Sequence, residues 1–148
     1  MKVEPGVILY LETSALLRWL LMGPRGDEVF DLLKRAERVA ASRLVLGAAR
    51  RILTRRESAG LQSAQSAGIA QTDLAAEAAR WDIVELGEPI WLRAEARFPL
   101  EPVRMLDALH LASALHYLSA VGELKMLSFD ERVLGNWKAM GLAAAADE

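Results

Sequence analysis

The stretch VILYLETSALLRWL, residues 7–20, changes from the pattern of a strand to the pattern of a helix at a single acid. Residues 7–11 are apolar without interruption, which is typical of a strand buried on both faces of a sheet. Glu12 ends that run, and the residues that follow place apolar side chains at helical spacing. We therefore predict a strand over residues 7–11 and a helix over 14–22, with a carboxylate where the strand ends.

The composition is that of one globular domain without disulfides. The chain has 148 residues, of which 53% are hydrophobic and 26% charged, so a packed core is expected and disorder is excluded. We expect a single domain over residues 1–148. Because there is no cysteine, disulfides, thiolate nucleophiles and cysteine-rich zinc sites are excluded, and a cytoplasmic location is expected. Glu12 and Arg18 interrupt the longest apolar run, so we expect no membrane span or signal peptide.

Predicted strands and helices alternate along the chain, which favours an α/β fold. The further predicted strands cover residues 39–41, 83–86, 126–129 and, as an edge strand, 142–146. The further predicted helices cover residues 27–38, 44–58, 62–80, 89–98, 104–119 and 131–140. This order implies a three-layer α/β/α architecture, a short parallel sheet with helices on both faces. In such a sheet the working crevice lies at the carboxyl ends of the strands.

Positive charge is concentrated in one part of the chain, although the net charge is −2. Residues 38–56 carry six arginines and no acid. A local basic face of this kind can attract phosphate even on a weakly acidic protein. A solvated helix face would give the same pattern, and both interpretations stay open.

Three carboxylates are predicted to lie where strands end or helices begin. Glu12 ends the first strand, and Asp130 follows the strand 126–129. Asp107 lies in the first turn of the helix 104–119, which is apolar nearly all round. Because parallel strands end at one edge of their sheet, these acids should converge. A buried carboxylate needs a cation, hydrogen bonds or a shifted pKa, and a shared metal ion would meet that need.

Each acid also has a purely structural explanation. Asp130 suits the N-cap of the helix that follows it, and Ser128 with Glu131 could form a capping box there. Asp107 is favoured by the helix dipole and could pair with Arg104. The acid at the end of the first strand could pair with a nearby arginine. Only the joint pattern points to a metal site.

The available ligands indicate which metal such a site would hold. Carboxylate oxygens, with no cysteine and one nearby histidine, suit Mg²⁺ or Mn²⁺ better than zinc. A carboxylate-bound divalent ion beside an arginine-bearing face is typical of enzymes that cut phosphodiesters, because the metal activates water and neutralises charge on the phosphate.

Four segments resemble the signature regions of PIN domains, in particular the VapC-like toxin ribonucleases of bacterial toxin–antitoxin pairs. In chain order they are YLETSALLRWL, ASRLVLGAARRIL, LDALHLASAL and LSFDERVLGNWKAMGL. The resemblance implies an α/β/α PIN-like fold, Mg²⁺- or Mn²⁺-dependent cleavage of RNA, a homodimer, and a small antitoxin protein that blocks the site. Asp107 and Asp130 match two acids of the family motifs. Ser128 matches the hydroxyl residue beside the second acid, and Arg51 matches an arginine of the second segment.

Two positions depart from the family pattern, so the predicted acidic site is degenerate. Glu12 stands where the family has aspartate, and Ala48 stands where it has glutamate. Mg²⁺ demands near-octahedral geometry, and a misplacement of about 1 Å can cost about 100-fold in rate. Glu57 lies on roughly the opposite face of the same helix. A replacement acid would therefore have to come from another element, for example Glu85 or Asp73.

The remaining candidates are hydroxyl and ring side chains near these acids. Thr13 and Ser14 suit a helix cap, and their polar groups would also face the crevice. Thr13 is therefore a predicted binding residue, together with Ser128 and Arg51, which the resemblance implies. We interpret His110 as a core histidine bonded to a neighbour. The tryptophans are interpreted as core or interface anchors; they are Trp19, Trp81, Trp91 and Trp137.

The sequence thus supports two main hypotheses of function. The first is a metal-dependent endoribonuclease with Glu12, Asp107 and Asp130 as catalytic and metal-binding residues. The second is a PIN-like domain that has lost catalysis and binds RNA or protein, which the alanine at position 48 favours. A phosphotransfer domain is weaker, because such domains cluster two acids early in the chain and only Glu4 accompanies Glu12 there.

Overall fold

The protein is built on one parallel sheet of four strands. A computed structural model describes residues 6–145 of the chain. The strands are β1 (Ile8–Leu11), β2 (Arg38–Ser42), β3 (Asp82–Val84) and β4 (Lys125–Leu127). Their spatial order is β3-β2-β1-β4, and all three neighbouring pairs are parallel, as predicted. Because β1 lies between β2 and β4, its carboxyl end lies beside the carboxyl end of β4.

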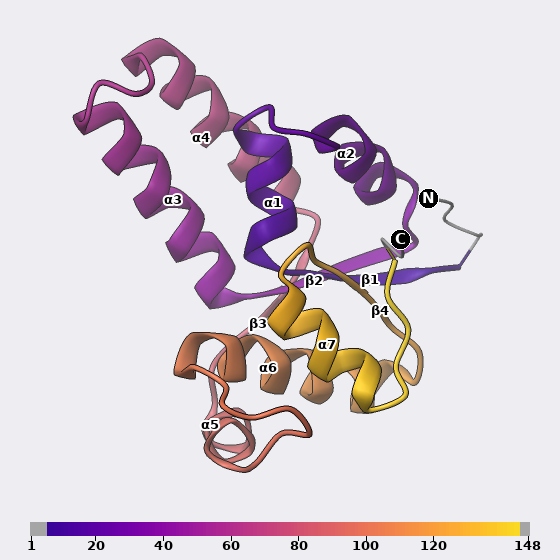
Figure 1. The fold of residues 1–148 in the computed structure, drawn as a ribbon. Helices are drawn as coiled ribbons and strands as arrows, with labels where there is room; N and C mark the ends of the chain where they lie inside the picture. The colour runs from indigo at the N-terminus through magenta and orange to yellow at the C-terminus, as the bar shows by residue number, and fades with distance from the viewer. Residues whose placement is uncertain (1–5, 146–148) are drawn as a thin grey trace.

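Helices cover both faces of the sheet (Figure 1). Four of them, α1 to α4, lie on one side, and α5, α6 and α7 lie on the other. Their bounds are α1 Thr13–Leu20, α2 Gly26–Arg35, α3 Arg43–Ser58, α4 Ala64–Ala78, α5 Glu88–Glu95, α6 Met105–Val121 and α7 Glu131–Ala139. The predicted α/β fold with helices on both faces is confirmed, and the helix predicted over residues 27–38 ends early because β2 begins at Arg38.

The alternation of side chains along β1 builds the two cores. Leu9 and Leu11 pack into a cluster with residues of α1 to α4, and both are fully buried. Tyr10 points to the opposite face, into a cluster with α6 and α7 that contains the fully buried Trp137. Successive strand residues point to opposite faces, so a strand covered on both sides must be apolar throughout. This is why residues 7–11 read as an unbroken apolar run.

The last two predicted strands, 126–129 and 142–146, differ from expectation. β4 ends at Leu127, two residues before the predicted end, because the next residues take part in side-chain hydrogen bonds rather than ladder bonds. The tail forms a single parallel bridge between Met126 and Ala144 instead of a strand. Alanine is a poor strand former, which fits this short pairing. Ala146, the last residue of the predicted edge strand, lies outside the described residues.

Within residues 6–145, no helix is both long and apolar enough to cross a membrane.

Candidate acidic site

Glu12 lies at the centre of the carboxyl edge of the sheet. Its backbone N–H donates to the carbonyl oxygen of Leu127 at 3.0 Å, which joins the ends of β1 and β4. The side chain is the N-cap of α1, where Oε1 accepts the backbone N–H of Ser14 at 3.2 Å. The residue is only 4% exposed. The prediction that Thr13 or Ser14 caps this helix is wrong, because the longer glutamate side chain folds back to the same amide.

Two serine hydroxyls hold the Glu12 carboxylate in place. Oε1 of Glu12 accepts from Ser14 Oγ at 2.5 Å and from Ser128 Oγ at 2.6 Å. Each serine uses its single proton on this carboxylate and accepts one backbone N–H, from Phe129 to Ser14 at 2.8 Å and from Asp130 to Ser128 at 3.0 Å. The predicted arginine partner of Glu12 is therefore replaced by hydroxyls. All of these side-chain bonds fall on Oε1.

Asp130 caps the helix that follows it. Its Oδ1 accepts the backbone N–H of Arg132 at 2.9 Å and that of Val133 at 3.4 Å, so the capping interpretation is confirmed. The capping box from Ser128 to Glu131 is wrong, because the Ser128 hydroxyl is engaged by Glu12 and by the Asp130 amide. The half-buried carboxylate of Asp130 thus lies at the edge of the sheet beside Glu12.

Asp107 reaches the same edge from the first turn of α6. Burial raises the pKa of its carboxyl above the usual value, and the charges of Asp130 and Glu12 raise this pKa further. His110 and Arg132 act in the opposite direction. The three predicted acids, which come from separate segments, therefore lie within electrostatic reach of one another.

His110 is buried beside these acids, as predicted for a core histidine. It is 6% exposed, and its Nε2 lies 3.4 Å from Thr13 Oγ1. Its Nδ1 is buried without a hydrogen-bond partner among the described residues. Burial lowers the pKa of the imidazole, while the charges of Glu12, Asp107 and Asp130 raise it; the net direction is downward. A neutral ring at pH 7 follows.

The core next to the site contains further polar groups without partners among the described residues. The hydroxyls of Tyr10 and Ser113 are fully buried and make no hydrogen bond of normal geometry within residues 6–145. Burial raises the pKa of the Tyr10 hydroxyl, nearby Ser113 lowers it, and the charge of Glu12 raises it. Tyr10 is therefore a neutral phenol, and the core near Glu12 contains buried hydroxyls as well as apolar side chains.

Within the described part of the chain, none of the candidate acids takes the place of the glutamate missing at position 48. Ala48 is half-buried in α3, and Glu57 is exposed near the end of the same helix. Glu85 is engaged by Arg43, which contacts both of its carboxylate oxygens. Asp73 lines a different hollow, between α1–α2 and α3–α4.

The arginines predicted to bind phosphate lie on α3. Arg51 and Arg55 are exposed there, and the structure places neither in contact with the three acids. Arg50 and Arg56 donate to glutamine side chains, Gln71 on α4 and Gln62 before α4, so two members of the basic run join the helices of this hairpin. The basic face is thus partly structural.

The chemical type of these ligands suits a divalent cation better than their positions do. Their oxygen ligands and mutual repulsion suit a hard cation such as Mg²⁺ or Mn²⁺. Among the residues that the structure describes, however, no three histidine or carboxylate side chains are close enough to hold one metal ion together. Glu12 in particular is folded back onto two serines and an amide.

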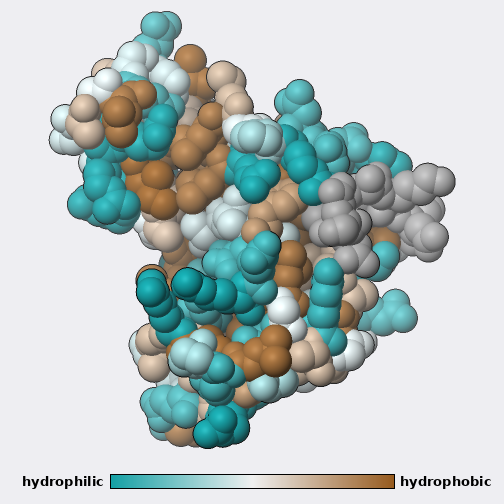
Figure 2. Space-filling model, viewed as in Figure 1, coloured by the Kyte–Doolittle hydropathy of each residue, from teal (hydrophilic) through white to brown (hydrophobic). Residues whose placement is uncertain are grey.

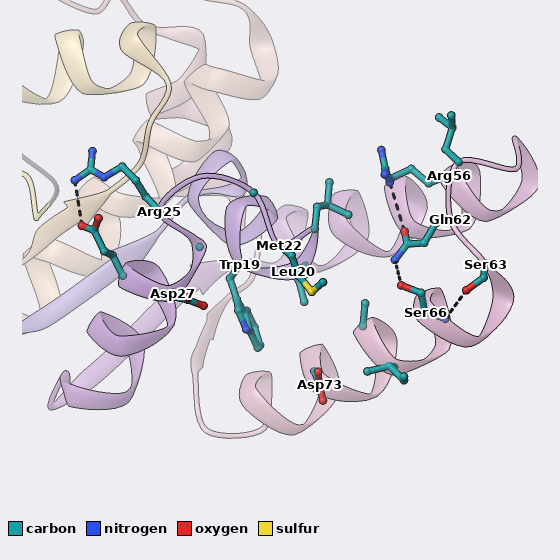
Figure 3. A pocket seen from close by; sticks show the side chains of 17 residues that line it. Trp19, Leu20, Met22, Arg25, Asp27, Arg56, Gln62, Ser63, Ser66 and Asp73 are labelled. Atoms are coloured by element: carbon teal, nitrogen blue, oxygen red, sulfur yellow. Dashed lines mark hydrogen bonds and ion pairs between the residues drawn. The ribbon is translucent and has the colours of Figure 1, made fainter.

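A hollow that sequence reasoning missed lies on the side of the sheet that α1 to α4 cover. We call it the groove: a cavity of about 940 Å³ between the α1–α2 pair and the α3–α4 hairpin (Figure 3). Its rim includes Met22, Leu61 and Ile69, which are 86%, 66% and 56% exposed. Figure 2 shows apolar surface on the part of α3 and α4 that faces α1. Apolar residues at the turns of two helical hairpins were the only sequence signal for this surface.

Comparison with known proteins agrees with this geometry. The family model described as the PIN domain matches residues 9–135. No curated protein matches the chain.

Solved structures share the fold at low sequence identity. A toxin–antitoxin complex from Klebsiella pneumoniae is 14% identical with a TM-score of 0.61, and the match covers 95% of this chain and 99% of that one. VapC20 of Mycobacterium tuberculosis, a toxin that cleaves the sarcin–ricin loop, is 17% identical with a TM-score of 0.64, covering 94% and 99%. VapBC2 from Rickettsia felis, bound to promoter DNA, is 14% identical with a TM-score of 0.62, covering 93% and 97%.

The family model spans β1 to the first turns of α7 and includes all three acids at the carboxyl edge of the sheet. Together with the order of the strands and the shared fold, this establishes that the chain belongs to the PIN-domain family.

Proposed function

We propose that the protein is a metal-dependent endoribonuclease, the toxin of a toxin–antitoxin pair, with a weakened metal site. The observation that supports this most directly is that Glu12 and Asp130 lie close enough to Asp107, at one edge of the sheet, for their charges to add to the effect of burial in raising its pKa. Similarity of fold to toxins such as VapC20, which cleaves the sarcin–ricin loop, favours RNA as the substrate. The predicted setting is the cytoplasm.

In this proposal the three acids would supply carboxylate ligands to Mg²⁺ or Mn²⁺, which would activate water and neutralise charge on the scissile phosphate. Ser14 and Ser128 orient the carboxylate of Glu12 through its Oε1, which leaves Oε2 for the cation. Thr13, Ser128 and Arg51 are proposed to bind the substrate. The half-buried position of Asp107 excludes part of the surrounding water and strengthens its interaction with a cation.

The direct test is RNA cleavage by the purified chain in Mg²⁺ and in Mn²⁺, with fragments resolved on a gel. Asp107→Asn removes one charge and keeps the shape of the side chain, so cleavage should disappear. Asp31→Asn, at an exposed acid on α2 that pairs with Arg35, is the matched control and should cleave like the parent. If the parent cuts RNA no faster than Asp107→Asn, the proposal of a nuclease is wrong.

A second function is favoured by the arrangement of the ligands. Ala48 offers no carboxylate, and within residues 6–145 no three side chains converge on one metal ion. The alternative is a catalytically inactive PIN-like domain that binds RNA or protein. The variant carrying Glu12→Asp and Ala48→Glu separates the two. Metal-dependent cleavage by this variant and none by the parent would support the inactive domain, whereas robust cleavage by the parent would refute it.

The proposed antitoxin binds in the groove. The groove exposes apolar side chains between two helical hairpins, and its acids Asp27 and Asp73 make no ion pair in the described part of the chain. An apolar segment that carries a lysine or arginine would complement both features. The structures from Klebsiella pneumoniae and Rickettsia felis are toxin–antitoxin assemblies, which is consistent with a protein partner for this fold.

The proposed homodimer would use a different apolar surface. Leu92, Leu100 and Leu106 are 59%, 53% and 61% exposed on α5, on the loop after it and at the start of α6. A second copy bound there would lie next to Asp107. Sedimentation equilibrium should give a dimer for the parent and a monomer for Leu92→Glu; a monomeric parent would exclude the homodimer.

A further inference from the structure

One aromatic ring at the acidic site is held between two cations. The guanidinium carbon of Arg18 lies 4.5 Å from the centroid of the Phe129 ring, and that of Arg25 lies 5.0 Å from it. Both distances are within the range of a cation–π interaction, which is about 6 Å. Arg18 comes from α1 and Arg25 from the loop between α1 and α2, so this ring joins the last strand to the first helical pair.

Phe129 is tied directly to the groups that position the acids. It lies between Ser128 and Asp130 in the chain, and its backbone N–H donates to Ser14 Oγ at 2.8 Å. That hydroxyl in turn donates to Glu12 Oε1. A displacement of Phe129 would therefore alter the hydrogen bonds of Glu12 and the position of the Asp130 carboxylate.

Of the two arginines, Arg25 belongs to the wall of the groove, and Arg18 supports the loop that carries it. Arg25 lines the groove, and its guanidinium is directed to an ion pair with Glu28 at 3.4 Å; Figure 3 marks the ion pair of Arg25 with a dashed line. Arg18 donates from Nη1 to the carbonyl oxygen of Pro24 at 3.1 Å, so it fastens the same loop. Arg25 thus contacts both the groove and the aromatic ring beside the acidic site.

The loop that carries Arg25 contains two residues with strained backbone angles. Met22 and Arg25 have φ angles of 53° and 65°, in the left-handed region that side chains other than glycine rarely adopt. Gly26 packs so closely on α1 that an added Cβ would lie 2.4 Å from the carbonyl oxygen of Arg18. Strain of this kind persists only where surrounding contacts impose it, so a ligand that contacts the loop can shift it.

We propose that Arg18 and Arg25 are positioning residues that act through Phe129 and couple occupancy of the groove to the alignment of Ser128 and Asp130. A partner segment in the groove that displaces Arg25 loosens Phe129 and disturbs the acid cluster at a distance, without entering it. The regulatory consequence rests on the proposed nuclease and its antitoxin, whereas the coupling itself is a property of the isolated chain.

The coupling can be measured without metal, RNA or partner. The chain contains three phenylalanines, Phe30, Phe98 and Phe129, so labelling with 4-fluorophenylalanine gives three fluorine signals. Phe98 lies beneath Arg93 on the other face of the sheet and serves as an internal reference. Arg25→Met should shift the Phe129 signal and leave that of Phe98 unchanged.

Amide hydrogen exchange gives a second readout on the same variant. Arg25→Met should speed exchange at the Phe129 and Asp130 amides roughly two- to fivefold, as expected for the loss of one cation–π contact between half-buried side chains. Arg25→Lys should restore most of the protection. Arg35→Met, on the exposed side of α2, is the control and should change neither readout. Unchanged signals and exchange in folded Arg25→Met would overturn the coupling.

Occupancy of the groove can be imitated because the chain has no cysteine. A single Ile69→Cys variant, modified with a bulky maleimide, fills the groove from α4, opposite Arg25. The adduct should shift the Phe129 signal in the parent background and fail to do so in Arg25→Met. The same adduct on Leu92→Cys, on α5, should leave the signal in place. No shift from the adduct at position 69 would refute the proposal.

Cleavage assays then separate this inference from the proposed function. If the chain cuts RNA, Arg25→Met should lower kcat and leave KM unchanged, because Arg25 orients the acids and touches no substrate. An unchanged kcat in a variant with loosened Phe129 would refute the regulatory part. If the chain does not cut RNA, the fluorine and exchange measurements still decide whether the coupling exists.

Discussion

The acidic site and the groove are built in opposite ways. The acidic site joins residues more than a hundred positions apart in the chain: the hydrogen bond from Ser128 to Glu12 spans 116 positions, and its central carboxylate is 4% exposed. The groove is formed by two helical hairpins that are local in sequence, and Met22 on its rim is 86% exposed. Buried and hydrogen-bonded acids suit chemistry on a small reacting group, whereas exposed apolar side chains suit the binding of a partner chain.

The largest expected effect is on the rate of RNA cleavage, which should depend on an acid of the acidic site and not on an acid of the groove. Glu12→Gln keeps the acceptor oxygen for both serines and removes the charge, so RNA cleavage should fall roughly 100-fold while the fold is retained. Asp73→Asn, at an acid on α4 that lines the groove, should leave the rate unchanged. Cleavage rates and melting temperatures measure both variants. An equal rate for Glu12→Gln and the parent would mean that Glu12 only caps α1.

The next effect concerns the ion pair that joins the two walls of the groove. Glu77 on α4 is 6% exposed and accepts from Lys34 on α2 at 3.1 Å and from Arg80 at 2.7 Å. Glu77→Gln should lower the free energy of unfolding by about 1–3 kcal/mol at pH 7, because a buried charged hydrogen bond is weakened. Asp31→Asn, which removes an exposed pair with Arg35, should cost less than about 1 kcal/mol.

The pH dependence of this ion pair has a definite sign. Burial raises the pKa of Glu77, but the bonds and charges of Arg80 and Lys34 outweigh it, so the net pKa lies below its ordinary value of 4.5. A carboxyl with a lowered folded pKa stabilises the protein above the unfolded pKa, and this contribution is lost as the pH falls through the folded value. The stability difference between the parent and Glu77→Gln should therefore shrink below about pH 4.5. If urea unfolding gives the same difference in unfolding free energy between the two proteins from pH 7 to pH 3, this prediction is wrong.

The smallest effect on the isolated chain is expected at the rim of the groove. The double substitution Met22→Ser and Leu61→Ser removes exposed apolar surface and should change stability by less than about 0.5 kcal/mol per site and cleavage not at all. The same variant should fail to be silenced when it is co-expressed with a protein encoded by an adjacent reading frame that silences the parent. Full silencing of this variant would show that the partner binds outside the groove.

Much of the acidic site could be predicted because its residues follow local rules. An apolar run that stops at an acid marks the end of a parallel strand, and this rule placed Glu12 and Asp130 at one edge. Asp107 was predicted from the unlikely position of a carboxylate on an apolar helix. The metal ligation by these acids stays a prediction. The sequence could not show whether Glu85 or Asp73 replaces the glutamate missing at position 48. In the structure Glu85 pairs with Arg43 and Asp73 lines the groove, and both placements depend on tertiary packing.

The sequence by itself determined the alternation of strands and helices, the parallel sheet and the three acids, because apolar periodicity and strand ends are local properties of a chain. Only the tertiary structure decided how Glu12 is used. Its carboxylate folds back onto Ser14 and Ser128, since the end of β4 lies beside the end of β1. The groove and the contacts of Arg18 and Arg25 with Phe129 were likewise decided by packing, because they join segments whose distance along the chain gives no sign of their distance in space.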